Sequence, residues 1–222
     1  MMKEIIVGDC ILAVCPNFKG AAVYADFVNS PYCAELWKEI DQSVSQCREQ
    51  YTTESLKQIP SIEATRAAYR KLGKDPSRYR PSGEALVRRV LQDKDLYQIN
   101  TAVDLINLAS IEHGYSIGGF DCSKIEGDTL RLGVGKKDEP YEGIGRGMLN
   151  IEGLPVYRDS IGGIGTPTSD HERTSLSLDT TLLLAIVNGY DGNAEGVMAC
   201  AKRIAELMNK YTACKSCNIT TF

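Results

Sequence analysis

The sequence predicts an α+β fold, organised as one domain over residues 1–222. Apolar residues three and four positions apart, which is the helical spacing, recur through the first half of the chain and again near its C-terminal end. Most of the 20 glycines lie between Gly114 and Gly165, where short apolar stretches alternate with glycine-rich turns. Helices combined with strands from separate parts of a chain are typical of a layered α+β domain.

The N-terminal half is predicted to begin with two strands and to continue as helices. Short apolar stretches at residues 5–14 and 21–28 are separated by Pro16-Asn17 and Gly20 and have the character of strands. Apolar spacing and helix-start residues predict four helices, over residues 31–48, 60–73, 82–91 and 101–112. In the third helix, Ser82 is the candidate N-cap. The fourth is apolar on nearly all sides and is expected to be buried.

The C-terminal half is predicted to contain strands and then one long helix. The strand candidates are residues 129–134, 154–158 and 182–187. Asp191-Gly192-Asn193 supplies the start signals of a last helix, in which apolar residues recur from Val197 to Met208. The tail that follows, with Cys214 and Cys217, is expected to be loose and exposed.

Composition excludes several classes of protein. A hydrophobic content of 43% and a charged content of 24% are those of an ordinary soluble globular protein. No apolar stretch approaches the roughly 20 residues that span a bilayer, and residues 1–14 hold no signal-peptide core, so we expect a cytoplasmic protein with no membrane partner. Cys214-Lys-Ser-Cys217 has the spacing of metal ligands, but the chain has only two histidines and no second Cys-x-x-Cys. We therefore predict no metal and no cofactor.

One segment is strongly basic although the whole chain has a net charge of −4. Between residues 66 and 90 the acidic residues are Asp75 and Glu84, whereas the basic residues are Arg66, Arg70, Lys71, Lys74, Arg78, Arg80, Arg88 and Arg89. Such a cluster can neutralise the phosphates of RNA, and tyrosines among it can stack on bases. A solvated helical surface whose charges pair with the acidic remainder is the alternative interpretation.

Two linked segments, residues 100–121 and 153–174, resemble the editing module of the phenylalanyl-tRNA synthetase beta subunit. The family pattern in the first segment is matched in order and spacing by Val103, Asp104, Asn107, Gly114, Phe120 and Asp121. The resemblance covers roughly residues 66–192 and implies a sheet layer, a second sheet layer and a helical layer. The N-terminal sixty residues and the last helix would be additions that complete a freestanding version.

The resemblance also implies site residues. The family places an asparagine at the aminoacyl pocket, here Asn107, and a glycine-rich loop around it, here Gly162 and Gly163, whose amides could stabilise an oxyanion. In the polar run 166–174, Asp170, His171 and Glu172 are candidate proton acceptors. Candidate substrate-binding residues in the same run are Thr166, Thr168, Ser169 and Arg173. The residues alone also allow a buried asparagine that holds a loop, an ordinary glycine turn and a capped surface turn.

One departure from the family concerns a histidine. Many members carry a histidine eleven residues after the asparagine, where this chain has Gly118. We therefore expect a larger and less polar pocket. Hydrolysis would depend on bound water, backbone donors and the terminal hydroxyl of the tRNA.

The function that the resemblance implies is a freestanding editing module that binds the aminoacylated 3′ end of tRNA and hydrolyses the ester of mischarged tRNA. DNA is not expected as a partner. Two alternatives stay open: a noncatalytic RNA-binding domain that kept the fold, and a small-molecule hydrolase or amino-acid-binding protein. The machinery of a complete tRNA ligase is absent from the sequence, and no serine, zinc or cysteine hydrolase signature is present.

Overall fold

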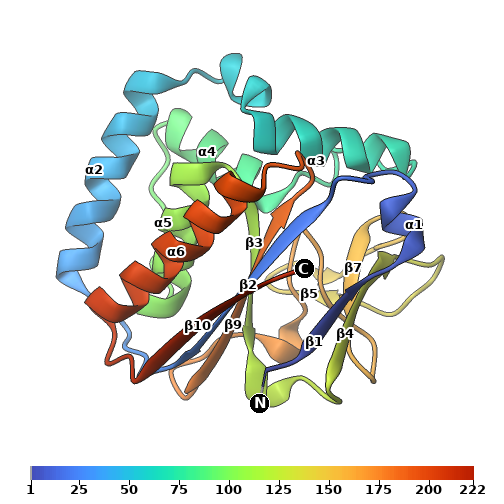
Figure 1. Cartoon of the computed structure of the whole chain (residues 1–222). Helices are drawn as coiled ribbons and strands as arrows, with labels where there is room; N and C mark the ends of the chain where they lie inside the picture. The colour runs from blue at the N-terminus through green and yellow to red at the C-terminus, as the bar shows by residue number, and fades with distance from the viewer. Residues whose placement is uncertain (1) are drawn as a thin grey trace.

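The computed structural model describes residues 2–222 and has three layers, a helical layer and two sheets (Figure 1). The middle sheet has the strand order β10-β2-β9-β3 and is antiparallel throughout. Its strands are β10 (Ser216–Thr221), β2 (Lys19–Asp26), β9 (Leu182–Gly189) and β3 (Ser116–Asp121). The α+β layered class expected from the sequence is thus confirmed.

The outer sheet has the order β1-β4-β7-β8. Its strands are β1 (Glu4–Val7), β4 (Thr129–Val134), β7 (Pro155–Arg158) and β8 (Gly163–Gly165), with β1 parallel to β4 and the other pairs antiparallel. A two-stranded hairpin, β5 (Glu142–Gly143) and β6 (Gly147–Met148), lies beside it.

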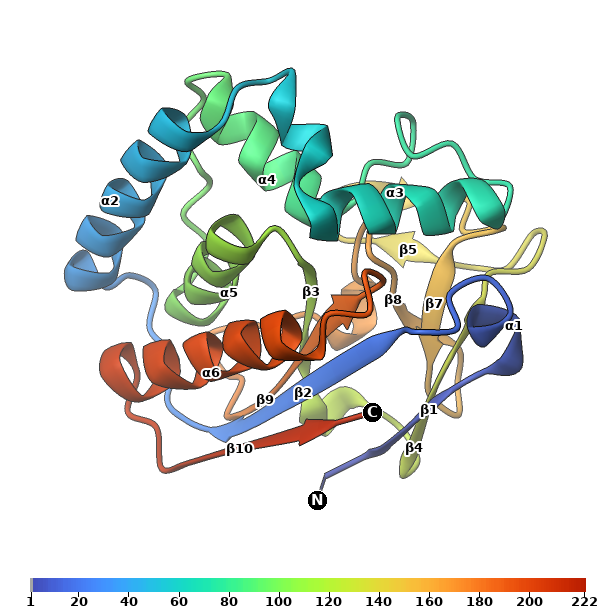
Figure 2. The same cartoon turned by 45° about the horizontal axis from the view of Figure 1, so that its top comes forward.

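Residues 2–222 contain six α-helices, and the longest of them lie together on one side of the middle sheet (Figure 2). The six helices are α1 (Asp9–Leu12), α2 (Ala34–Gln50), α3 (Pro60–Lys71), α4 (Ser82–Leu91), α5 (Thr101–His113) and α6 (Ala194–Tyr211). Short 3-10 turns occur at η1 (Ser55–Gln58), η2 (Cys122–Lys124) and η3 (Glu172–Thr174). Among the described residues, no helix has the length and hydropathy that a bilayer crossing requires.

The middle sheet is buried on both faces because its strands contribute alternate residues to two cores. Val23 and Ala185 face α5 and α6, whereas Tyr24 and Leu184 face the outer sheet. This explains why β2 and β9 read as continuous apolar runs rather than alternating ones.

Helix α5, which supplies one wall of the candidate site, is bounded as its sequence indicates. The Asn100 side chain accepts a hydrogen bond from the backbone N–H of Val103 at 3.0 Å, and Gly114 ends the helix with a φ of 72°. From Thr101 to Ile111 its side chains are buried, as predicted, except those of Val103 and Asn107, which are half-buried. These two positions face the cavities described below.

The structure corrects four sequence-based expectations. The first predicted strand ends at Val7, and α1 follows it. Helix α2 begins at Ala34 rather than near Pro31, and Pro81 rather than Ser82 is the N-cap of α4, with no side-chain hydrogen bond. The tail is not loose: β10 pairs with β2 over six residues and places Cys217 opposite Ala25, because β2 would otherwise leave an edge unpaired.

Candidate functional site

Three neighbouring cavities open where α4, α5 and the loop after β8 meet, and Asn107 lines all of them. The inner cavity, of about 150 Å³, is also lined by Ser110 and Thr166. The outer cavity, of about 350 Å³, extends toward Val103 and Leu176. The basic cavity, of about 410 Å³, is described separately below.

Asn107 projects from α5 as a half-buried side chain. No hydrogen bond from residues 2–222 reaches its carboxamide, so the alternative of a buried asparagine that holds a loop is not supported. A carboxamide open to a cavity keeps both its donor and its acceptor available to a ligand.

Asp170 lies where the inner and outer cavities meet, because it lines both. Its Oδ2 atom accepts a hydrogen bond of 2.9 Å from the backbone N–H of Gly119. Burial raises the pKa of this carboxyl from 3.8 to about 7, against the opposing effect of that hydrogen bond. A carboxyl group whose pKa is near neutrality, in a cavity beside a free carboxamide, has the properties of a general acid or base.

Gly118 lines none of the three cavities. An added Cβ would lie 2.6 Å from Cζ of Phe120 and 3.4 Å from Oδ1 of Asp170, and the cavity is lined instead by Ile117 and Gly119. The absence of a side chain at Gly118 therefore adds no open space to these cavities, because the Phe120 ring fills the space beside it. The same ring and Asp170 also approach Gly165.

We accordingly predict that Gly118→His destabilises the protein and does not create a site. Inserting a ring against Phe120 overpacks the core, which costs about 1–3 kcal/mol. Urea unfolding measures the change, and Gly162→Ala is the control, because an added Cβ at Gly162 has no atom within 4 Å. Equal stability of the two variants would show that the Phe120 ring moves away at no cost.

Four hydroxyl side chains also line the inner cavity: Ser82, Ser110, Thr166 and Ser169. Ser110 donates to the carbonyl of Tyr115 at 2.6 Å. The Thr166 hydroxyl accepts from the backbone N–H groups of Thr168 and Ser169, which shapes the turn before Asp170. This turn holds the Asp170 side chain against β3.

The remaining predicted residues of the segment 166–174 differ in their positions and contacts. Glu172 lines the outer cavity and accepts from the N–H of Gly145 at 3.0 Å, and Thr168 lines the basic cavity. His171 lines none of the three cavities: its Nδ1 accepts from the N–H of Arg173, and burial, with the nearby Arg173 guanidinium, lowers its pKa. Arg173 forms a double 2.9 Å contact with Asp159 and is likewise outside the cavities.

The glycine-rich run takes part in packing rather than in lining the cavities. The N–H of Gly162 donates to Oδ1 of Asp159 at 3.1 Å within the turn between β7 and β8. An added Cβ at Gly163 would lie 2.9 Å from the Tyr141 ring. We therefore leave both residues out of the mechanism proposed below.

The basic cavity is lined by five cationic side chains and no carboxylate: Arg80, Arg88, Arg89, Lys94 and Arg146. Tyr97 stands beside them with 67% of its surface exposed, and the Arg89 guanidinium lies 4.0 Å from the centre of its ring. Because Ser82, Leu86 and Asn107 line both this cavity and the inner one, the two are contiguous.

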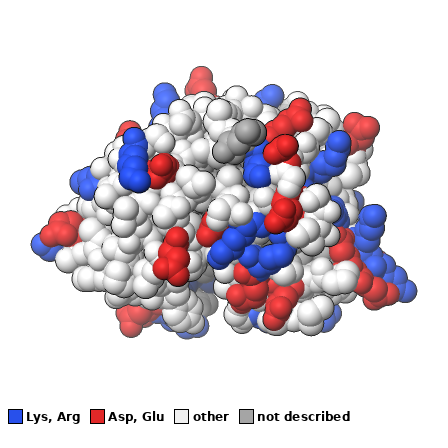
Figure 3. All heavy atoms as spheres, turned by 90° about the horizontal axis from the view of Figure 1, so that it is seen from below, with Lys and Arg blue, Asp and Glu red and all other residues white. Residues whose placement is uncertain are grey.

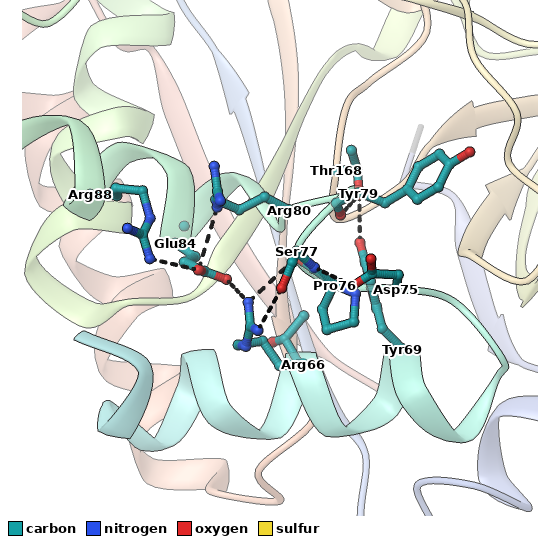
Figure 4. Close-up of polar contacts among 12 residues, drawn as sticks. Arg66, Tyr69, Asp75, Pro76, Ser77, Tyr79, Arg80, Glu84, Arg88 and Thr168 are labelled. Carbon is teal, nitrogen blue, oxygen red and sulfur yellow. Dashed lines mark hydrogen bonds and ion pairs between the residues drawn. The ribbon is translucent and has the colours of Figure 1, made fainter. Parts of the chain in front are cut away.

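Two of these arginines are held by a buried carboxylate, Glu84 (Figure 4). Glu84 is fully buried and also forms a 2.7 Å ion pair with Arg66, whose side chain is 6% exposed. Arg80 and Arg88 approach the other carboxylate oxygen at 3.4 and 3.5 Å. The single negative charge of Glu84 thus pairs with three guanidinium groups. This leaves a local excess of positive charge at the wall of the basic cavity.

The eight basic residues singled out in the sequence therefore separate into three groups. Arg80, Arg88 and Arg89 line the basic cavity. Arg66 and Lys74 are buried, and Lys74 donates to the carbonyls of Asn150 and Glu152, so neither is placed to meet RNA. The exposed residues that lie outside the cavity lining are Arg70, Lys71 and Arg78.

The face that carries the N-terminus has a different character. Acidic and basic side chains lie next to one another there, without a field of one sign (Figure 3). Among residues 2–222, no group of three or more His, Cys, Asp or Glu side chains could hold a metal ion.

Fold and cavities together define a layered α+β domain with a carboxyl group in a polar cavity beside a cationic cavity. The model of the B3/4 domain family matches residues 64–212, and the chain belongs to this family. The resemblance to the phenylalanyl-tRNA synthetase beta-subunit editing domain, inferred from the sequence, is thereby confirmed.

One similar solved structure is the N-terminal fragment of the phenylalanyl-tRNA synthetase beta subunit from Pyrococcus horikoshii. The match has a TM-score of 0.47 and 13% sequence identity, and covers 99% of this chain and 52% of that one. The chain thus spans about half the length of that fragment. A search of curated proteins finds no match.

Sequence reasoning missed several residues of the site. Ser110, Lys94, Tyr97 and Arg146 line the cavities but belong to no motif. Lys94 and Arg146 are more than fifty residues apart in the chain, so no local pattern could connect them. Ser82 has a sequence signal only as a helix cap.

Proposed function

We propose that this chain is an editing-type module that binds the aminoacylated 3′ end of a tRNA and hydrolyses the ester of a mischarged one. The observation that carries the proposal is the position of Asn107, which borders a cationic cavity on one side and the Asp170 cavities on the other. An aminoacyl-tRNA end has the same two parts: phosphates, and an ester that carries an amino acid.

We propose that the basic cavity binds the phosphates near the 3′ end. The guanidinium group of arginine can donate two parallel hydrogen bonds to phosphate oxygens. Five cationic side chains in a cavity that no carboxylate lines favour an anionic ligand. The exposed ring of Tyr97, together with Arg89, offers a stacking surface for a base.

The inner cavity is the proposed place of the chemical step. Asp170 takes a proton from water as the water oxygen bonds to the ester carbonyl carbon, and the Asn107 amide donates to the carbonyl oxygen as negative charge develops there. The bond from that carbon to the ribose oxygen then breaks, and the proton passes to the leaving ribose oxygen. The products are a free amino acid and a tRNA with its terminal hydroxyl restored.

The test is to incubate the purified protein with tRNAs that carry correct and incorrect radiolabelled amino acids and to follow loss of the ester. Release from a subset of the panel, faster than in buffer and lost in Asn107→Ala, is the expected result. Salt-dependent tRNA binding without release would favour the noncatalytic RNA-binding alternative. If the protein neither releases the amino acid nor binds tRNA, the small-molecule alternative remains.

We predict that removing the cations of the basic cavity weakens tRNA binding without unfolding the protein. Arg89, Lys94 and Arg146 do not pair with Glu84, so their joint replacement by alanine leaves the buried network intact. Each phosphate that is no longer neutralised should reduce the slope of log K against log salt by roughly 0.7 for single-stranded RNA, about 2 for the triple variant. Filter binding at a series of salt concentrations measures this slope.

The matched control for the triple variant replaces Lys38, Lys57 and Lys202 by alanine, which removes three exposed cations from α2, η1 and α6, none of which lines the basic cavity. It should leave both the affinity and the salt slope unchanged. Equal weakening in both variants would assign binding to the net charge of the protein and not to this cavity.

A further inference from the structure

The outer cavity has an aliphatic wall that the hydrolytic step does not use. Six of its lining side chains are aliphatic: Ile99, Val103, Ile106, Ile117, Ile144 and Leu176. They come from the segment before α5, from α5 itself, from β3, from the β5–β6 hairpin and from the loop after η3. Ile99 and Ile144 are 56% and 42% exposed, so apolar surface continues to the rim of the cavity.

The charged groups of the outer cavity are carboxyl groups only. Asp170 and Glu172 line it, and no Lys, Arg or His does. Asp170, with Asn107, lies where the outer cavity meets the inner one, so it stands close to the proposed reacting ester. An aminoacyl ester carries an α-ammonium next to its carbonyl, and carboxylates at this place would satisfy that charge.

We infer that the outer cavity binds the side chain of the esterified amino acid, and that it selects apolar side chains of the size of leucine, isoleucine, methionine or phenylalanine. This inference rests on the proposed function. A cavity of about 350 Å³ is at the small end of ligand sites, which run from about 300 to 1,000 Å³, and so suits one side chain. Burial of an apolar side chain against six aliphatic groups is favourable.

Polar side chains should be rejected for distinct reasons. An acidic side chain would meet Asp170 and Glu172 with like charge. A small hydroxylated side chain, such as that of serine, would leave the aliphatic wall uncovered. The phenol of a tyrosine side chain that lies among the six aliphatic groups exchanges its hydrogen bonds to water for apolar contacts, which costs free energy.

The experiment uses one tRNA transcript charged in turn with leucine, isoleucine, methionine, phenylalanine, tyrosine, serine, aspartate and lysine, so that the RNA is constant. We expect kcat/KM to be at least about tenfold higher for the four apolar esters than for the serine and aspartate esters. Phenylalanyl ester should react roughly 5- to 150-fold faster than tyrosyl ester, from which it differs by one hydroxyl group.

Two variants test whether the aliphatic wall is responsible. Ile99→Asn with Ile144→Asn places polar groups at the rim and should lower kcat/KM for leucyl ester about tenfold while seryl ester changes little. Ile161→Asn is the control, because Ile161 is 66% exposed in the β7–β8 turn and does not line the cavity.

The outcomes separate this inference from the function on which it rests. Hydrolysis of all esters at similar rates, or preference for tyrosyl, seryl or lysyl ester, would overturn the inference and leave the editing function standing. Absence of hydrolysis would overturn the editing function. In that case equilibrium binding of amide-linked aminoacyl-tRNA analogues decides the inference: tighter binding of the leucyl than of the seryl analogue supports it, and equal binding overturns it.

Discussion

Replacing Asp170 by asparagine is expected to lower kcat for deacylation by about 10²–10⁴-fold, the usual contribution of a general base. The substitution keeps the size of the side chain, and its carbonyl can still accept the hydrogen bond from the N–H of Gly119. It removes the ability to take a proton from water. The affinity for tRNA should be unchanged, because the basic cavity is not lined by Asp170.

The same group predicts the pH profile of the reaction. With a pKa of about 7, Asp170 is protonated and inactive as a base at low pH. The value of kcat/KM should therefore rise about tenfold per pH unit below 7 and become constant above it, with spontaneous ester loss subtracted at each pH. A profile without this rise, or an Asp170→Asn variant with wild-type kcat, would contradict the assignment.

The free energy of unfolding should change with pH in the opposite direction to kcat/KM, so it should fall as the pH rises. Because the folded-state pKa of about 7 exceeds the ordinary value of 3.8, the folded protein binds more protons than the unfolded chain between these values. Stability from this group is complete below about pH 4 and is lost as the pH rises through 7. Asp170→Asn should therefore gain in Tm relative to the wild type from pH 4 to pH 8, whereas Asp179→Asn, at an exposed turn, should not.

The largest effect on stability is expected from Glu84→Gln. Glu84 is fully buried and faces Arg66, Arg80 and Arg88. Removing one partner of a buried ion pair costs about 3–5 kcal/mol, because the remaining charge is left without compensation. Urea unfolding measures the loss, and Glu63→Gln, an exposed residue on α3, is the control with the same chemical change.

A second variant separates the ion pair from simple packing. Arg66→Met removes the most deeply buried guanidinium, whose Nη1 lies 2.7 Å from Glu84. The double variant Glu84→Gln, Arg66→Met should be less destabilised than the sum of the two single changes, because neither charge is left alone. Additive effects would show that the three arginines are compensated by groups other than Glu84.

Much of the fold could be predicted from local patterns. Helices α3, α5 and α6 and strands β4 and β9 lie close to the predicted ranges, because their apolar spacing and caps act within a few residues. Strand β10 could not be predicted in this way: its sequence has weak apolar character, and its partner β2 lies almost two hundred residues away. The strand prediction for residues 8–14 is wrong because a short apolar run does not distinguish a strand from one helical turn.

The candidate site was predictable only in part. Asn107, Asp170, Glu172, Thr166, Thr168 and Ser169 were singled out in the sequence, and the structure brings them to the cavities. Their roles stay predictions. Other residues have contacts that the sequence does not reveal. Arg66 is buried because it pairs with Glu84, and Gly162 and Arg173 both contact Asp159. Tertiary packing brings these partners together.

The sequence by itself determined the fold class, the family and the types of side chain available for chemistry. These follow from periodicity and from motif residues at fixed spacing, which are properties of the chain alone. Only the tertiary structure decided that a basic cavity and the cavity with Asp170 share Asn107, that the Phe120 ring fills the space beside Gly118, and that desolvation raises the pKa of Asp170. Contact and desolvation are properties of atoms in space, and they arise only when distant segments are packed together.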